Sequence, residues 1–161
     1  MTLWTERSPV AAALLNPALL GVVTAAAASE YRRASDKEMP WALAFLIAPL
    51  VLHRETREAL PRDTRSHLAT WVTNNPVLRS GFPQRARSLV EPVREGLRFG
   101  LANGFLSVTQ GGGLLGALSS SARPQRGSDL AAVVRSAGFV GKWLTKIDQP
   151  STAFALLGVA P

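Results

Sequence analysis

The 161-residue chain contains no cysteine and only two histidines, His53 and His67. The absence of cysteine excludes disulfides, thiolate metal sites and a cysteine nucleophile. A zinc site takes three or four ligands, so two histidines fourteen residues apart make no metal pattern. We therefore predict no metal and no cofactor. Both histidines are interpreted as polar side chains at a helix end or at the edge of the core.

The sequence also lacks a motif for nucleotide or acyl chemistry. The glycine triplet at residues 111–113 is not followed by Lys-Ser or Lys-Thr, so it is not a phosphate-binding loop. The serines at 119–121 lie in a polar linker, which is not the context of a nucleophile elbow. We predict that the chain has no catalytic residues and is not an enzyme.

Long apolar runs are missing as well. The longest, residues 11–29, is interrupted by an Asn-Pro pair, and the second, residues 41–52, has only twelve residues. A membrane-spanning helix needs about 20 strongly apolar residues. Glu6 and Arg7 precede any apolar run, which is the wrong order for a secretory signal. We expect a cytoplasmic protein with no membrane partner, and keep membrane association as a third, weaker alternative.

Lysine is scarce, with 3 Lys against 15 Arg in a chain of formal net charge +7. A GC-rich genome would explain the excess of arginine by composition alone. Arginine nevertheless suits bidentate contacts to carboxylate or phosphate better than lysine does. A protein with this charge is attracted to acidic partners or to nucleic acid, and the attraction weakens as salt rises.

The pattern of apolar residues and caps predicts a mainly α fold. We expect a single compact helical domain over residues 1–161, with one short β-hairpin and a winged-helix-like order of elements. The predicted helices span, approximately, residues 16–33, 40–52 with a kink or an end at Pro49, 65–73, 83–103 with a kink or split at Pro92, 129–146, and a short final turn or helix from 149. Gly81-Phe82-Pro83 predicts a turn, and Asn74-Asn75-Pro76 the end of a helix.

Residues 105–108 and 114–118 are predicted to be strands joined by the turn TQGGG, because glycines permit the positive φ angles of hairpin loops. Residues 119–128 are polar and basic, which predicts a flexible loop. The alanine-rich middle of the first helix predicts close packing, and the apolar tail is expected to pack onto the core or into a partner. Three tryptophans fit core patterns, whereas Trp4 could be an exposed anchor.

The most informative segment is LHRETREALPRDTR, residues 52–65, which carries four arginines and three acids between two apolar runs. Such a density of charge is hard to bury, so the segment is expected at a surface or an interface. We expect Arg57 and Arg65 to be structural or partner contacts, held in part by Glu58 and Asp63. The candidate partner-binding residues are Arg54, Arg57, Glu58, Arg62 and Arg65.

A second group of arginines is a candidate for weak nucleic-acid binding. Three of them are spaced seven and four residues apart, which places them on one face of the predicted helix 83–103, with Glu91 among them. Two more lie in the predicted loop. Charge alone attracts phosphates without sequence preference. The group comprises Arg87, Arg94, Arg98, Arg123 and Arg126.

The sequence also resembles the small middle component of bacterial three-component ABC systems, from about Asn16 to the end. The resemblance is carried by LVLHRETREALPRDTRSHLATWVTNNP, GFPQRA, VREGLRFGLANGFLSV, AGFVGKWL and FALLGVAP. It implies a role beside an SMC- or Rad50-like ABC ATPase and a separate effector, in systems thought to defend against phage or plasmids. One departure is the turn TQGGG, which replaces a more acidic turn and puts the contacts of the hairpin in doubt.

Two function classes therefore compete. The first is a non-enzymatic adaptor that binds an ATPase and couples it to an effector, with DNA reached through the complex. The second is a stand-alone winged-helix DNA-binding regulator. An adaptor should carry faces of mixed charge, as in residues 52–65, whereas a DNA reader should carry a nearly pure basic recognition helix. Glu91 and Glu95 lie in the best candidate helix, which favours the adaptor.

Overall fold

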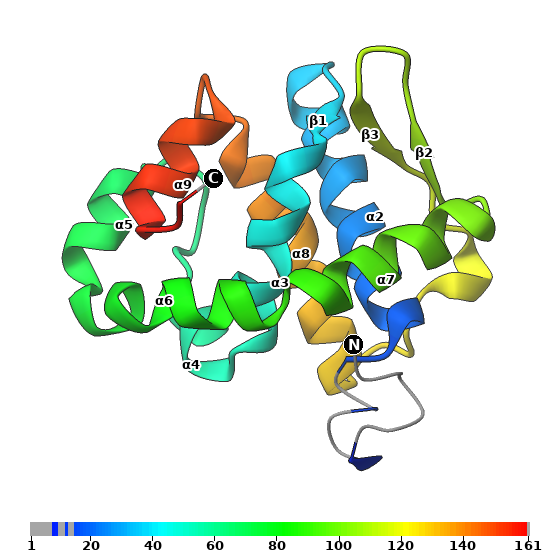
Figure 1. Cartoon of the computed structure of the whole chain (residues 1–161), viewed down its shortest axis with the longest axis horizontal. Coiled ribbons are helices and arrows are strands. Elements are labelled where there is room, and N and C mark those ends of the chain that lie inside the picture. The colour runs from blue at the N-terminus through cyan, green and yellow to red at the C-terminus, as the bar shows by residue number, and fades with distance from the viewer. Residues whose placement is uncertain (1–7, 10–11, 13–14, 161) are drawn as a thin grey trace.

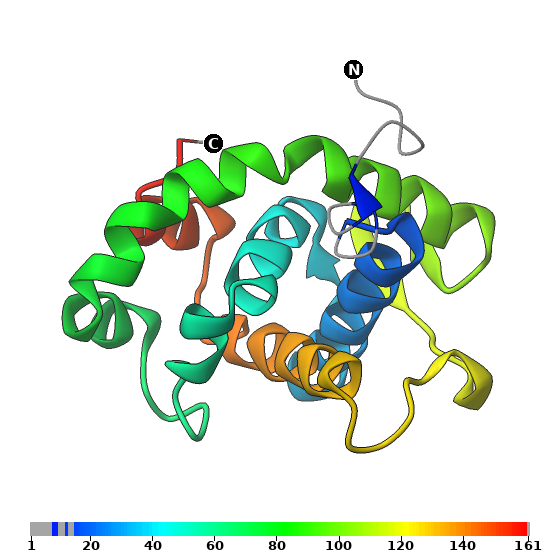
Figure 2. The ribbon, with the colours of Figure 1, turned by 90° about the horizontal axis from the view of Figure 1, so that it is seen from below.

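A computed structural model describes residues 8, 9, 12 and 15–160 of the chain. Its centre is helix α2 (Pro17–Ser35), which Figure 2 shows between α7 (Val90–Ala102) and α8 (Asp129–Leu144). Helix α2 begins as predicted, because the Asn16 side chain accepts a hydrogen bond of 2.8 Å from the amide of Ala18. It ends at Ser35, and its C-cap residue, Asp36, has a φ of 58° and lies in the left-handed region.

The neighbours of α2 approach it closely through small residues. Ala25, Ala27 and Ala28 are fully buried. A Cβ atom added to Gly141 on α8 would overlap the backbone of Ala27, and one added to Gly116 would overlap the backbone of Ala25. The predicted close packing of the alanine-rich helix is therefore confirmed.

After α2 the chain forms a short strand, β1 (Met39–Pro40), a 3-10 turn (Trp41–Leu43) and helix α3 (Ala44–Leu52). The prediction of a helix from Pro40 was wrong at its start, because Pro40 pairs with a later strand. Pro49 does not end the helix, which continues to Leu52 with Leu50 and Val51 fully buried. The apolar run therefore forms the middle of the core, as its composition indicates.

The next part of the chain contains α4 (Arg54–Glu58), α5 (Leu68–Asn74) and α6 (Pro76–Ser88). Helix α5 ends at the Asn-Asn-Pro sequence as predicted. The prediction of a turn at Gly81-Phe82-Pro83 was wrong, because all three residues lie inside α6. A proline inside a helix costs about 3 kcal/mol. Phe82 is fully buried, and burial of such a side chain offsets much of that cost.

The predicted helix 83–103 is divided, and the division falls at Leu89, between α6 and α7. Pro92 explains the position. Its nitrogen has no hydrogen to donate to the carbonyl of Ser88, and its ring collides with that carbonyl in a continuous helix. The split that Pro92 predicts is thus confirmed, three residues before the proline itself.

The strands form a small antiparallel sheet in the order β1–β3–β2. The predicted hairpin is confirmed as β2 (Leu106–Val108) and β3 (Gly113–Gly116), with Val108 opposite Leu114. Sequence reasoning missed β1, which pairs Met39 with Leu114. A strand is recognised in a sequence by apolar and polar residues that alternate, and a strand of two residues is too short to show this alternation. The fold is mainly α with a small β part, as predicted.

The C-terminal part begins with residues 119–128, which include a 3-10 turn (Ser120–Ala122), so the flexibility expected there stays a prediction. Ser128 caps α8 by accepting a hydrogen bond of 3.1 Å from the amide of Ala131. Helix α9 (Pro150–Leu157) packs on α5 and α6, and Leu157 is fully buried, so the apolar tail packs onto the core.

Two of the three tryptophans placed by sequence in the core lie there, Trp71 and Trp143. The assignment of Trp41 to the core was wrong, because it is 55% exposed and packs edge-on against Phe45. The candidate anchor Trp4 lies outside the described residues.

Candidate functional site

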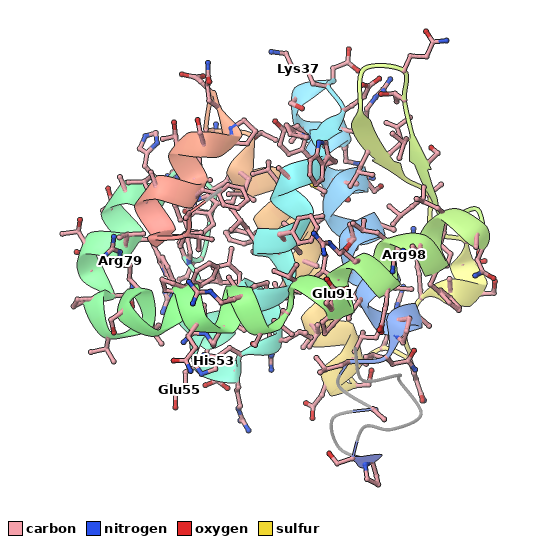
Figure 3. All side chains as sticks on the ribbon, viewed as in Figure 1. Lys37, His53, Glu55, Arg79, Glu91 and Arg98 are labelled. Atoms are coloured by element: carbon pink, nitrogen blue, oxygen red, sulfur yellow. The ribbon has the colours of Figure 1, made fainter. Side chains whose placement is uncertain are left out.

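The arginine-rich segment, residues 52–65, is built on a buried polar cluster at α4. The His53 side chain, which Figure 3 labels, caps this short helix by accepting a hydrogen bond of 3.3 Å from the amide of Thr56. The Thr56 hydroxyl is fully buried and lies 2.8 Å from His53 Nδ1. The interpretation of His53 as a helix-end residue is confirmed.

The same cluster reaches helix α6 through Arg85. One terminal nitrogen of Arg85 donates to Thr56 Oγ1 at 3.3 Å and to the carbonyl of Leu78 at 2.9 Å. The guanidinium also lies 5.8 Å from the centre of the Phe82 ring. Burial lowers the pKa of Arg85, and the charge of Glu55 opposes that shift. The two sequence blocks that contain His53 and Phe82 are therefore joined in space by Arg85.

The side chain of Arg57 is bonded within the fold. Its guanidinium donates to the carbonyl of Val51 at 2.6 Å, near the C-terminal end of α3. A cation at this end of a helix satisfies a free carbonyl and complements the helix dipole. The Glu58 carboxylate bonds Arg54 at 2.7 Å, and Arg57 interacts with it through charge alone, which helps to lower the pKa of Glu58.

Two tryptophans hold the loop that follows α4. The indole nitrogen of Trp71 donates to the carbonyl of Ala59 at 2.7 Å, and that of Trp143 donates to the carbonyl of Ser66 at 2.5 Å. The two rings pack edge to face, with their centres 6.0 Å apart. The loop between Ala59 and Ser66 is thus tied to the core near both ends.

Several charged side chains of residues 52–65 are exposed, outside the buried cluster at α4 and the contacts with the two tryptophans. Arg65 is 90% exposed and bonds the carboxylate of Asp63 at 2.7 Å, as expected. The side chain and the amide of Arg65 both lower the pKa of Asp63. Arg54 is 81% exposed, its bond to Glu58 lowers the pKa of that carboxyl, and Arg62 is also exposed. The arrangement presents mixed charge on a rigid support, which suits recognition of a charged surface.

The arginines predicted for nucleic acid do not form one cluster. Arg87 lies on α6, whereas Arg94 and Arg98 lie on α7, beyond the break at Leu89, so the predicted single helical face was wrong. Arg94 bonds the carboxylate of Glu91 at 2.5 Å on the same helix. Figure 3 shows Glu91 and Arg98 on α7.

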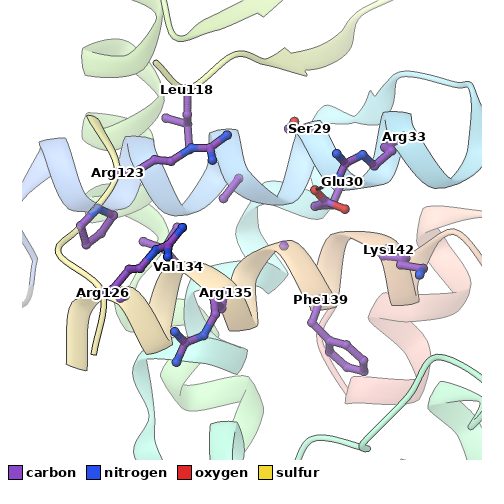
Figure 4. Close-up of a pocket in the computed structure, with 14 residues that line it drawn as sticks. Ser29, Glu30, Arg33, Leu118, Arg123, Arg126, Val134, Arg135, Phe139 and Lys142 are labelled. Atoms are coloured by element: carbon purple, nitrogen blue, oxygen red, sulfur yellow. Dashed lines mark hydrogen bonds and ion pairs between the residues drawn. The ribbon is translucent and has the colours of Figure 1, made fainter. Parts of the chain in front are cut away.

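The other two arginines in that group, Arg123 and Arg126, line a separate groove on the α8 side of α2, which Figure 4 shows in close-up. Sequence reasoning missed this groove, because three of its cationic residues come from helices far apart in the chain. Those three are Arg33, Arg135 and Lys142.

Within the described part of the chain, no group of three or more His, Asp or Glu side chains is placed to hold a metal ion. Among those same residues no helix is both long and apolar enough to cross a membrane.

The model of the family described as ABC-three component (ABC-3C) system Middle Component 3 matches residues 4–161. The chain belongs to this family. The resemblance inferred from the sequence is confirmed, and the match covers nearly the whole chain. Searches of curated proteins and of solved structures found no match.

Proposed function

We propose that this middle component is a non-enzymatic adaptor that links an SMC- or Rad50-like ABC ATPase to an effector protein. The proposed setting is a bacterial system that defends the cell against phage or plasmids. We place it in the cytoplasm, because a chain without cysteine needs no disulfide and therefore no oxidising compartment. Membership in the ABC-3C family supports a role within such a system. DNA would be engaged through the complex rather than by the isolated chain.

The observation that carries the proposal is the contrast within the arginine-rich segment. Arg57 and Thr56 are held in the fold, whereas Arg54 is exposed on α4. Arg62 and Arg65 are exposed on the loop that two tryptophans tie to the core. A rigid support reduces the conformational entropy lost on binding. We therefore place the ATPase contact on these exposed side chains, with Glu58 beside them.

The test measures binding of the purified ATPase encoded with this protein to Arg62→Ala and Arg65→Ala variants. If these side chains are desolvated at the interface, each truncation should cost about 2 kcal/mol of binding or more. On a solvated surface the cost should stay under about 1 kcal/mol. Arg32→Ala is a matched control, because Arg32 is an exposed arginine on α2, outside the segment.

Arg57→Ala is less informative in that experiment, because its loss would also free a carbonyl of α3. Wild-type binding by both Arg62→Ala and Arg65→Ala would remove the segment from the interface. The non-enzymatic role has its own test: the purified chain should hydrolyse no nucleotide, and turnover above a buffer control would contradict it.

The alternative function is a stand-alone winged-helix DNA-binding regulator. The order of α6, α7, β2 and β3, with β1 beside β3, favours it. Against it, Glu91 on α7 pairs with Arg94, so the helix before the hairpin is not purely basic. A salt titration on one specific and one scrambled DNA duplex separates the two. Tight binding to one sequence that survives high salt would favour the regulator.

A further inference from the structure

The groove on the α8 side of α2 is lined by several cationic side chains, which the contact proposed for the ATPase does not use. It is formed by α2, α8 and the segment 118–126, and has a volume of about 820 Å³ (Figure 4). Five cationic side chains and one carboxylate line it. They come from three separate stretches of the chain. We call it the basic groove, defined by Arg33, Arg123, Arg126, Arg135, Lys142 and Glu30.

The charge of the basic groove is poorly compensated. Glu30 bonds Arg33 at 2.9 Å. The other four cations have no ion pair with any residue of the described part of the chain, which leaves an excess of four positive charges. Figure 4 shows Arg123, Arg126 and Arg135 near one end and Lys142 toward the other. An occupant should therefore carry negative charge along its length.

The lining between these charges is apolar and partly made of small residues. Ala26 and Ala131 contribute buried methyl groups, and Gly138 contributes no side chain at all. Leu118 and Val134 add larger, half-buried surfaces. Small residues allow the backbone or side chains of an occupant to come close, and apolar contacts favour an occupant with an apolar stripe.

We propose that the basic groove binds an acidic amphipathic helix of a partner protein, with its apolar stripe against the lining and its carboxylates against the four uncompensated cations. An amphipathic helix bound in a groove by its apolar face is a recurring mode of recognition. Nucleic acid would use the cations but not the apolar residues between them, because its outer surface is a dense array of phosphates.

This inference rests on the proposed adaptor function, for which it supplies a second contact surface. Figures 1 and 2 show α4 on one side of α8 and the segment 118–126 on the other. A partner in the basic groove would therefore leave the arginine-rich segment free for another protein. The two surfaces together could hold two components of one system at once.

The experiment measures the affinity of a fluorescently labelled synthetic helix that carries glutamates on both sides of a leucine stripe. A scrambled peptide of the same composition and a DNA duplex are measured in parallel. The groove variant is Arg126→Glu with Arg135→Glu, both exposed positions whose exchange should leave the fold intact. The control is Lys37→Glu with Lys146→Glu, which changes the net charge equally at exposed positions that do not line the groove; Figure 3 labels Lys37.

We expect the groove variant to bind the amphipathic peptide about tenfold more weakly than wild type, and the control variant to stay within about twofold. The scrambled peptide should bind wild type at least about fivefold more weakly, because it lacks the stripe. Equal peptide binding by the two variants would overturn the proposal. Loss of duplex binding alone in the groove variant would overturn it in favour of nucleic acid.

The outcome is separable from that of the adaptor proposal. If the ATPase and the effector bind but the peptide does not distinguish the variants, the groove inference fails and the adaptor role stands. If the peptide binds through the groove but neither protein binds the chain, the adaptor role fails and the groove remains an acidic-helix site.

Discussion

Thr56→Val should destabilise the protein by removing one hydroxyl from the cluster that joins α4 to α6. Thr56 is fully buried, and its Oγ1 lies 2.8 Å from His53 Nδ1 and 3.3 Å from a terminal nitrogen of Arg85. Valine keeps nearly the same volume and the same branching at Cβ. The substitution therefore tests the hydrogen bonds of the hydroxyl without opening a cavity.

The expected loss follows from those two contacts. A buried hydrogen bond between neutral groups contributes about 1 kcal/mol, and one to a charged group about 1.5–3 kcal/mol. The bond to Arg85 is long, and Arg85 keeps its bond of 2.9 Å to the carbonyl of Leu78. Its contribution should therefore fall at or below the lower end of that range. We expect Thr56→Val to lower the free energy of unfolding by about 2 kcal/mol.

The measurement is urea unfolding, followed by circular dichroism and by tryptophan fluorescence. Thr73→Val is a matched control, because its hydroxyl bonds the carbonyl of Ala69 at 3.0 Å on an exposed face of α5. The control should change the free energy of unfolding by less than about 0.5 kcal/mol. An equal, small effect of both substitutions would refute the reasoning. A double-mutant cycle of Thr56→Val with Arg85→Met should also give a coupling energy of at least about 0.5 kcal/mol.

Three further results are expected. Gly141→Ala should lower the free energy of unfolding by about 1–3 kcal/mol, because its Cβ would overlap the backbone of Ala27, whereas Gly138→Ala meets only a flexible side chain and should cost less than about 1 kcal/mol by the same assay. In an NMR titration Asp63 should titrate below its ordinary pKa, and Arg65→Ala should raise that pKa only part of the way back, because the amide of residue 65 still donates to the Asp63 carboxylate. Because the native pKa is the lower one, the stabilisation from this pair is present above the unfolded pKa and is lost as pH falls through the native pKa. The isolated chain should bind DNA at roughly micromolar affinity or weaker near physiological salt, without sequence preference and with a steep dependence on salt, and a salt-independent affinity would contradict this.

Features that depend on neighbouring residues could be predicted from the sequence. Asn16 and Ser128 cap helices at the predicted positions, because a cap needs only a side-chain oxygen two or three residues before a free amide. Pro92 predicts the break between α6 and α7 for a similarly local reason. The family resemblance also follows from residue order alone, and the match over residues 4–161 confirms it.

Features that depend on distant residues were decided by the tertiary structure. The sequence Gly81-Phe82-Pro83 favours a turn, but it is helical in α6. Burial of Phe82 in the core outweighs this local preference. Arg85 reaches Thr56, and Trp143 reaches the carbonyl of Ser66, across separations of 29 and 77 residues. Strand β1 exists only because β3 passes beside it.

The candidate surfaces divide in the same way. The charge of residues 52–65 made their exposure predictable, because closely spaced ions lose more hydration energy on burial than a fold of this size can return. The basic groove was not predictable, because Arg33 on α2 is far in sequence from Arg126 and Arg135, and the three line one groove only when α8 packs on α2. The sequence alone thus determined which residues carry charge, and the packing of helices determined which charges act together.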